Sequence, residues 1–304
     1  MLVVAVMRWC VTLVGFWLGA CAAPYPVDFA VLPPGRLPDA RVAAAMLEGP
    51  SSAGAALAAE TIDAVELGES RFEMGCLDGD PDCEADELPA ELVRVSAFAI
   101  DRHEVTWAQY AGCVEAGVCD KVMLSRCYVW NSARAFERGK ALDPGMVAAQ
   151  KPVVCVTWSQ AETFCEAHGG TLPSEAQWER TARGSRRSRY AWGNTPPTCE
   201  HAQFDGCGGV TNAVGTMPAG DSPEGVADLA GNVWEWAGDW YDPREYGRLR
   251  HRLRPRGPIE GDVRVVRGGS FYDASADLRA SYRYGLSPEY GYSTVGFRCA
   301  YPRS

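Results

Sequence analysis

The pattern of hydrophobic and polar positions divides the chain into three parts that differ in composition and periodicity. Residues 11–20 form a mainly apolar run, which is too short to span a bilayer but has the length of a signal-peptide core, and Arg8 precedes it. The next stretch is rich in alanine, proline and glycine and shows little periodicity, which is typical of a tether. From Leu67 onward, aromatic residues, glycines and cysteines are dense. We predict a signal segment over residues 1–20, a tether over 21–65 and one folded domain over 66–304.

Three segments carry the pattern of a helix start. In a capping box, a hydroxyl side chain and a Gln or Glu three residues later satisfy each other's backbone amides. The pattern begins at Thr106, Ser159 and Ser174. We predict helices over residues 107–116, 160–168 and 175–183.

The strands are expected to be short. Two stretches with alternating apolar and polar residues, 93–98 and 264–266, predict strands. Glycine and proline interrupt most of the remaining domain, so long elements are not expected there. Many turns and few long elements predict a single, irregular α+β domain.

Composition and charge exclude one class of partner. The 304 residues carry a net charge of -10, and Lys and Arg form no basic stripe. Since nucleic-acid binding requires clustered cations that neutralise phosphates, we expect no nucleic-acid partner. The chain has twelve cysteines but only four histidines and no C-x-x-C spacing. A disulfide framework in an oxidising compartment therefore explains the cysteines better than zinc does.

The end of the apolar run predicts a lipid anchor. Residues Leu18 to Cys21 read Leu-Gly-Ala-Cys, which resembles the lipobox of bacterial lipoproteins. The resemblance implies cleavage before Cys21 and a diacylglyceryl group on its sulfur, which would anchor the chain to a membrane outside the cytoplasm. Ala22 follows the cysteine, and by analogy this favours the outer membrane. An ordinary signal peptide or a buried apolar helix remains as the alternative.

The folded domain contains a series of short blocks. In sequence and in order they resemble the formylglycine-generating enzyme (sulfatase-modifying factor) domain family, over about residues 66–301. The resemblance implies an irregular α+β fold related to the C-type lectin fold. The blocks are Phe72–Gly75, Ile100–Thr106, Pro152–Val154, Val156–Trp158, Leu172–Glu179, Gly231–Trp236, Arg267–Ser270 and Gly296–Cys299.

A buried carboxylate is expected in one of these blocks. Glu235 stands between two tryptophans, and a carboxylate in such surroundings must be paired or bind a cation. The resemblance implies structural calcium, since carboxylate and carbonyl oxygens are what this cation takes. An ion pair between Glu235 and an arginine such as Arg298 is the alternative. The calcium ligands that the resemblance implies are Asp228, Gly231, Val233 and Glu235.

The ten cysteines beyond Cys21 can form five disulfides. The resemblance implies a bridge between Cys165 and Cys299, which closes a very long loop. For the other cysteines we expect pairs that are close in sequence, although connectivity does not follow from sequence alone. These expected pairs are Cys76–Cys83, Cys113–Cys119, Cys127–Cys155 and Cys199–Cys207.

The oxidising chemistry of the family has no counterpart in this chain. The family uses two cysteines after its Arg-Gly-Gly-Ser motif to bind copper, and thiolates suit Cu(I). Counting from Ser270, these positions hold Asp273 and Leu278, so copper is not expected. A polar, aromatic pocket is predicted in this region; the alternative is that Asp273 and Asp277 pair with nearby arginines. The pocket would contain Ser270, Asp273, Leu278, Arg279, Tyr282 and Arg283.

Three hypotheses follow for the function. The first is a non-oxidising, lipid-anchored homologue that binds a protein or peptide partner in the former substrate cleft. The second is a formylglycine-generating or related periplasmic oxidoreductase that acts on protein or peptide substrates. The third is a lectin-like carbohydrate-binding module. The sequence leaves open whether the chain is an enzyme.

Overall fold

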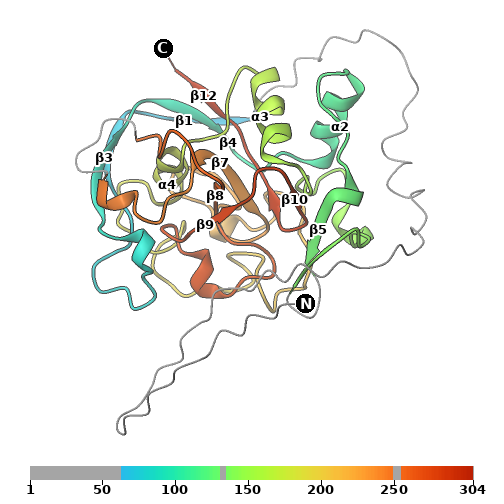
Figure 1. Ribbon diagram of the computed structural model, residues 1–304. Coiled ribbons are helices and arrows are strands. Elements are labelled where there is room, and N and C mark those ends of the chain that lie inside the picture. Colours follow the sequence, from blue (N-terminus) through green and yellow to red (C-terminus); the bar gives the residue numbers. More distant parts are fainter. Residues whose placement is uncertain (1–62, 131–134, 249–254, 304) are drawn as a thin grey trace, which may run out of the picture. The chain divides into compact units, whose positions relative to one another are not determined.

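Four small β-sheets make up the strand structure of the described residues, 63–130, 135–248 and 255–303, in the computed structural model (Figure 1). Hydrogen bonds join the strands in the orders β1-β4-β12, β10-β5-β6, β11-β7-β8-β9 and β2-β3. The predicted signal segment, Cys21 and nearly all of the tether lie outside the described residues. The strands are β1 Ala64–Leu67, β2 Ser70–Met74, β3 Glu91–Val95, β4 Phe98–Asp101, β5 Cys127–Trp130, β6 Phe136–Arg138, β7 Trp234–Trp240, β8 Arg264–Arg267, β9 Arg283–Leu286, β10 Gly291–Tyr292, β11 Val295–Gly296 and β12 Ala300–Pro302.

Each α-helix of the described residues begins at a capping box. Helix α2 spans Trp107–Glu115, α3 spans Trp158–Ala167 and α4 spans Glu175–Arg183. None of the described helices has the length and hydrophobicity needed to cross a membrane. Short 3-10 helices connect the other elements: η1 Ala85–Glu87, η2 Leu124–Arg126, η3 Pro144–Met146, η4 Pro218–Gly220, η5 Tyr246–Arg248 and η6 Ser275–Leu278.

The predicted caps of α2 and α4 are confirmed, but the predicted cap of α3 is wrong. Thr157 rather than Ser159 is the cap residue, and its side chain accepts a hydrogen bond from the backbone N of Gln160. Glu162, the predicted partner of Ser159, instead accepts a hydrogen bond from Leu172 N at 2.8 Å. A tertiary contact thus uses the side chain that the local pattern had assigned to the cap.

The stretch predicted as one strand over 93–98 belongs to two. Strand β3 ends at Val95 and pairs with β2, whereas β4 begins at Phe98 and pairs with β1 and β12. The predicted strand 264–266 lies within β8, which pairs with β7 and β9. The prediction of a mixed, irregular α+β domain is confirmed.

Helix α4 is buried among the sheets, and its charged residues are buried with it. Trp178 in α4 and Trp236 in β7 are fully buried. Each of four buried arginines forms an ion pair with a buried glutamate from a distant part of the chain. Such pairs are costly to desolvate but costlier to break, so they hold these segments in one arrangement. The pairs are Arg267–Glu179, Arg279–Glu87, Arg283–Glu175 and Arg298–Glu235.

Five disulfides join the described cysteines, and the pairings are those expected from the sequence. Cys165 of α3 is joined to Cys299 beside β12, across a sequence separation of 134 residues. The others close shorter loops: Cys76–Cys83, Cys113–Cys119, Cys127–Cys155 and Cys199–Cys207.

Candidate functional site

Asp273 lies in the loop after β8, where three donors converge on one of its oxygens. Its Oδ2 accepts hydrogen bonds from Ser270 N at 2.9 Å, from the Ser270 hydroxyl, and from the indole Nε1 of Trp234 at 2.8 Å. Burial raises the pKa of Asp273 to about 6, although the Ser270 and Trp234 hydrogen bonds act in the opposite direction. The carboxyl can therefore exchange a proton near neutral pH.

Leu278, at the second position where the family carries a cysteine, is a core residue. Its side chain is fully buried at the end of η6. Gly269 lies against it, since a Cβ on this glycine would come within 2.8 Å of Leu278 Cδ2. The two positions therefore offer a hydrogen-bonded carboxylate and a packed aliphatic side chain.

The two arginines of the predicted pocket pair with buried glutamates, so they are not free to bind a ligand there, although the Arg279 guanidinium also lies 5.4 Å from the centre of the Tyr282 ring. Arg279 donates to both oxygens of Glu87, at 2.6 and 2.7 Å, and Arg283 donates to both oxygens of Glu175, at 2.7 Å each. Both guanidiniums are buried and need a buried carboxylate, and these glutamates from η1 and α4 supply it.

The alternative, in which these arginines pair with Asp273 and Asp277, is wrong. Asp273 is held by Ser270 and Trp234, as described above. Asp277 instead accepts a hydrogen bond from the backbone N of Ala274 at 3.0 Å, which caps η6. The short sequence separations had suggested ion pairs, but both carboxylates are used by the local backbone and by Trp234.

Trp234 lies between Asp273 and two tyrosines, one of which, Tyr282, belongs to the predicted pocket. The ring of Tyr282 lies 5.8 Å from its ring, and that of Tyr284 lies 6.3 Å away. Tyr284 is 39% exposed, so this aromatic group reaches the surface. We call Ser270, Asp273, Trp234 and Tyr282 the Asp273 site. Sequence reasoning had not assigned Trp234 to it, although the tryptophan stands in one of the family blocks.

More aromatic rings continue from the Asp273 site. The ring of Tyr272, next to Asp273, lies 6.0 Å from that of Trp130 in β5, and Trp130 lies 4.8 Å from Phe136 in β6. Phe136 is 36% exposed and also contacts Tyr292 of β10, at 5.4 Å. Tyr272 and Trp130 are half-buried and Tyr292 is buried, so Phe136 is the ring at which this group reaches the surface.

Glu235, one of the predicted calcium ligands, forms the alternative ion pair. Arg298 donates to both of its oxygens, at 2.6 and 2.7 Å, and the indole of Trp178 donates to Oε2 at 2.7 Å. Arg298 also donates to the backbone oxygen of Ala227 at 2.9 Å, so it ties Glu235 to the loop before Asp228.

A second buried carboxylate near that loop has a free oxygen. Glu104 is 1% exposed; its Oε1 accepts from Asn232 Nδ2 at 2.9 Å, while its Oε2 has no hydrogen-bond partner. Burial and then the negative charge of Asp228 raise the pKa of Glu104 well above its usual value. An orphaned buried oxygen beside another carboxylate fits a hard cation. Sequence reasoning missed Glu104, although it stands in a family block directly before the apolar Val105.

Gly231 explains the shape of this loop. Its φ of +79° is left-handed, and a Cβ there would lie 2.3 Å from the backbone oxygen of Gln203. Asp228 and Asn232, on either side, are also left-handed, so the loop turns tightly over Gln203. Of the predicted calcium ligands, Asp228, Gly231 and Val233 belong to this loop, whereas both oxygens of the fourth, Glu235, are held by Arg298. Glu104 is the carboxylate that would hold calcium beside Asp228 in place of Glu235. Calcium stays a prediction, and the described residues contain no cluster of three His, Cys, Asp or Glu side chains suited to a metal.

Comparison with known proteins identifies a family and several relatives. Residues 55–302 match the model of the sulfatase-modifying factor enzyme 1-like domain. The "Formylglycine-generating enzyme" of Thermomonospora curvata is 32% identical over 272 residues, 75% of this chain and 90% of its own. The "Inactive C-alpha-formylglycine-generating enzyme 2" of Bos taurus is 31% identical over 287 residues, 79% of this chain and 88% of its own.

Another relative is much longer than this chain. "Serine/threonine-protein kinase pkn1" of Chlamydia pneumoniae is 34% identical over 241 residues, 78% of this chain but only 37% of its own length. Among solved structures, PvdO from Pseudomonas aeruginosa has a TM-score of 0.63 and 24% identity, covering 78% of this chain and 93% of that one. At this identity the likeness establishes the fold.

Proposed function

Because the chain belongs to the sulfatase-modifying factor enzyme 1-like domain family, we propose that it is a lipid-anchored, extracytoplasmic member of it. In this proposal it binds a protein or peptide partner at the Asp273 site, in the position of the family's substrate cleft. It does not carry out the copper-dependent oxidation. The observation that carries the proposal is the pair of residues at the two thiolate positions, a hydrogen-bonded Asp273 and a buried Leu278.

The state of the cysteines supports the absence of copper chemistry. All ten cysteines among the described residues are in disulfides, so none of them offers a thiolate to Cu(I). Leu278 has no ligand atom, and the Asp273 oxygen that receives Trp234 already accepts two further hydrogen bonds. A relative of similar length is itself named an inactive formylglycine-generating enzyme.

Partner binding is supported by the aromatic surroundings of Asp273. Tyrosine and tryptophan side chains are enriched where proteins bind other chains, since they bury a large area at a small entropic cost. Tyr284 and Phe136 are exposed, while Trp234 is fixed by its bond to Asp273. The same aromatic rings are also the feature that a lectin-like module would use to stack on sugars.

An oxidoreductase that acts on proteins or peptides is the second candidate. It is favoured by the relative named formylglycine-generating enzyme and by Asp273, whose pKa near 6 suits proton transfer. Metal analysis separates the candidates. We expect no stoichiometric copper or iron after reconstitution and no formylglycine in a co-expressed sulfatase peptide. The binding-only proposal would be refuted if the protein contained stoichiometric copper and Asp273→Ala removed both the copper and an oxidase activity.

Site-specific photocrosslinking tests the partner. A photoreactive phenylalanine at Tyr284 should crosslink to a discrete envelope protein or peptide. The matched control is the same group at Leu92, which is 45% exposed on β3, in a sheet that contains no residue of the Asp273 site. We expect the Tyr284 crosslink to disappear with Asp273→Ala. Equal crosslinking from both positions would refute binding at the Asp273 site, and a positive glycan array would favour the lectin-like module.

The proposed anchor has its own test. Metabolic labelling with an alkyne-tagged fatty acid should label the full chain, and Cys21→Ser should abolish the label. Density-gradient separation should place the labelled protein with the outer membrane. Cys10→Ser is the control, since this cysteine lies in the predicted signal segment. A Cys21→Ser protein that keeps the label would disprove the lipobox prediction.

A further inference from the structure

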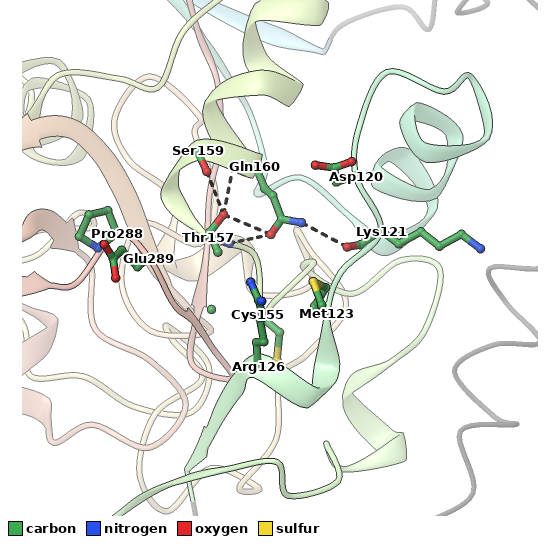
Figure 2. Close-up of a pocket in the computed structure, with 11 residues that line it drawn as sticks. Asp120, Lys121, Met123, Arg126, Cys155, Thr157, Ser159, Gln160, Pro288 and Glu289 are labelled. Carbon is green, nitrogen blue, oxygen red and sulfur yellow. Dashed lines mark hydrogen bonds between the residues drawn. The ribbon is translucent and has the colours of Figure 1, made fainter. Parts of the chain in front are cut away.

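A pocket of about 650 Å³ lies beside the first turn of α3 (Figure 2). Its volume is in the range of small-molecule sites. It shares no lining residue with the Asp273 site, and neither the family resemblance nor the proposed function uses it. The lining residues come from the segment between α2 and β5, from the start of α3, and from the turn before β10: Asp120, Lys121, Met123, Arg126, Cys155, Thr157, Ser159, Gln160, Pro288, Glu289 and Gly291.

Opposite charges line this pocket without neutralising each other. Asp120 and Glu289 are negative, Lys121 and Arg126 are positive, and all four are exposed. In the described part of the chain, none of these four side chains forms an ion pair or hydrogen bond. Elsewhere exposed opposite charges do pair, as in Lys140–Glu137 at 2.8 Å. The pocket therefore keeps unpaired charges of both signs around one hollow.

The charges also have distinct orientations. In Figure 2 the Arg126 side chain points toward Thr157 and the first turn of α3, where the hydroxyls of Thr157 and Ser159 lie 3.2 Å apart. The Lys121 side chain extends away from the other lining residues, and its backbone oxygen accepts from Gln160 Nε2. Arg126 is thus the cation that faces the hollow. The Thr157 hydroxyl is used by Gln160 in the cap of α3, whereas the Ser159 side chain is exposed.

Cys155, Gly291 and Pro288 form one side of the pocket, which we call the floor. Cys155 is held there by its disulfide to Cys127 and is 2% exposed. Gly291 crosses it so closely that a Cβ would lie 2.0 Å from the Cys155 backbone oxygen. Pro288 closes the same side. A preformed floor of this kind loses little entropy when a ligand binds.

We propose that this pocket binds a small zwitterion of the α-amino-acid class. The ligand's carboxylate lies against the Arg126 guanidinium and the Ser159 hydroxyl, since guanidinium and carboxylate form strong, directional hydrogen bonds. Its ammonium is received by Glu289 or Asp120, and its side chain lies over the disulfide floor. A polyanion such as phosphate is disfavoured because the two carboxylates on the rim repel it.

Calorimetry on the full-length protein tests the proposal with matched probes. The twenty common α-amino acids are screened first. The tightest binder is then compared with its analogue without the amino group and its analogue without the carboxyl group. We expect binding at one site, weakened at least about 10-fold by loss of either charge. No binding by any amino acid, or equally tight binding of inorganic phosphate, would overturn the proposal.

Charge variants locate the ligand. Arg126→Gln, and either Glu289→Gln or Asp120→Asn, should each weaken binding at least about 10-fold. Lys121→Gln is the matched control, because it removes a positive charge from the same rim on a side chain that points away; we expect less than a twofold effect. If Lys121→Gln weakens binding as much as Arg126→Gln, the ligand is held by general charge attraction and the proposal fails. All four residues are exposed, so circular dichroism should show folded variants.

Discussion

Arg298 holds both oxygens of Glu235 in the interior of the domain, with both side chains at most 1% exposed. Glu235→Gln leaves the buried Arg298 guanidinium without its hydrogen-bonded counter-charge, and it weakens the hydrogen bond from Trp178. We expect a loss of about 3–5 kcal/mol in the free energy of unfolding, measured by urea denaturation. The control is Glu69→Gln, which breaks an exposed pair with Arg94 and should cost at most about 1 kcal/mol. Equal losses in the two variants would contradict this role for the buried pair.

Asp239 in β7 should make stability depend on pH. Burial, followed by the negative charge of Glu175, raises its pKa from 3.8 to about 7. Between about pH 4 and 7 the folded state therefore binds more protons than the unfolded state. The stability that Asp239 contributes is fully present below pH 4 and is lost as the pH rises through 7.

Asp239→Asn removes this proton and keeps an oxygen for the hydrogen bond from Glu175 N. The free energy of unfolding of the variant, relative to the wild type, should rise with pH across the same window, by at most about 1.4 kcal/mol per pH unit. Comparing variant with wild type cancels Asp101 and Asp273, whose pKa values of about 6 act in the same direction. A difference that stays constant from pH 4 to 7 would contradict the assignment.

How much the sequence predicts depends on how local the deciding interaction is. The caps at Thr106 and Ser174 involve residues three apart, and they were predictable. The α3 start offers two overlapping capping patterns, and the Glu162 side chain that the second one needs is instead bound to Leu172 N, beyond the end of the helix. The partner of Arg279 is Glu87, 192 residues away, and no local pattern points to it.

The candidate site follows the same rule. The count from the Arg-Gly-Gly-Ser motif located Asp273 and Leu278, because the family blocks carry positions over from relatives. This count could not predict the hydrogen bond from Trp234 to Asp273 or the burial of Leu278 in the core. Both depend on how β7 packs against the loop after β8. Glu104 was missed for the same reason, since its neighbour Asp228 is 124 residues away.

Gly231 should tolerate no side chain. Gly231→Ala places a Cβ 2.3 Å from the Gln203 backbone oxygen and in a left-handed conformation. Left-handed backbone costs about 1–2 kcal/mol and the overpacking a further ~1–3 kcal/mol, so we expect a total loss of a few kcal/mol. Gly209→Ala separates the two effects, since φ is +75° there but no atom lies within 4 Å. Denaturation that gives the same loss for both variants would show that the contact with Gln203 does not matter.

The calcium prediction can be tested by comparing the stability of Glu104→Gln with that of the wild type, with and without calcium. In the presence of a calcium chelator, Glu104→Gln removes a buried carboxyl group that is costly to ionise beside Asp228, and the variant should be at least as stable as the wild type. With calcium the order should reverse, because bound cation stabilises the wild type by about 2.7 kcal/mol at 100 times its dissociation constant. Thermal melts of both proteins, with and without calcium, show whether the order of their stabilities reverses. The control is Glu162→Gln, which changes a carboxylate of α3 and should leave the calcium effect intact. A calcium shift that persists in Glu104→Gln would place the cation elsewhere, and no shift in the wild type would remove calcium from this protein.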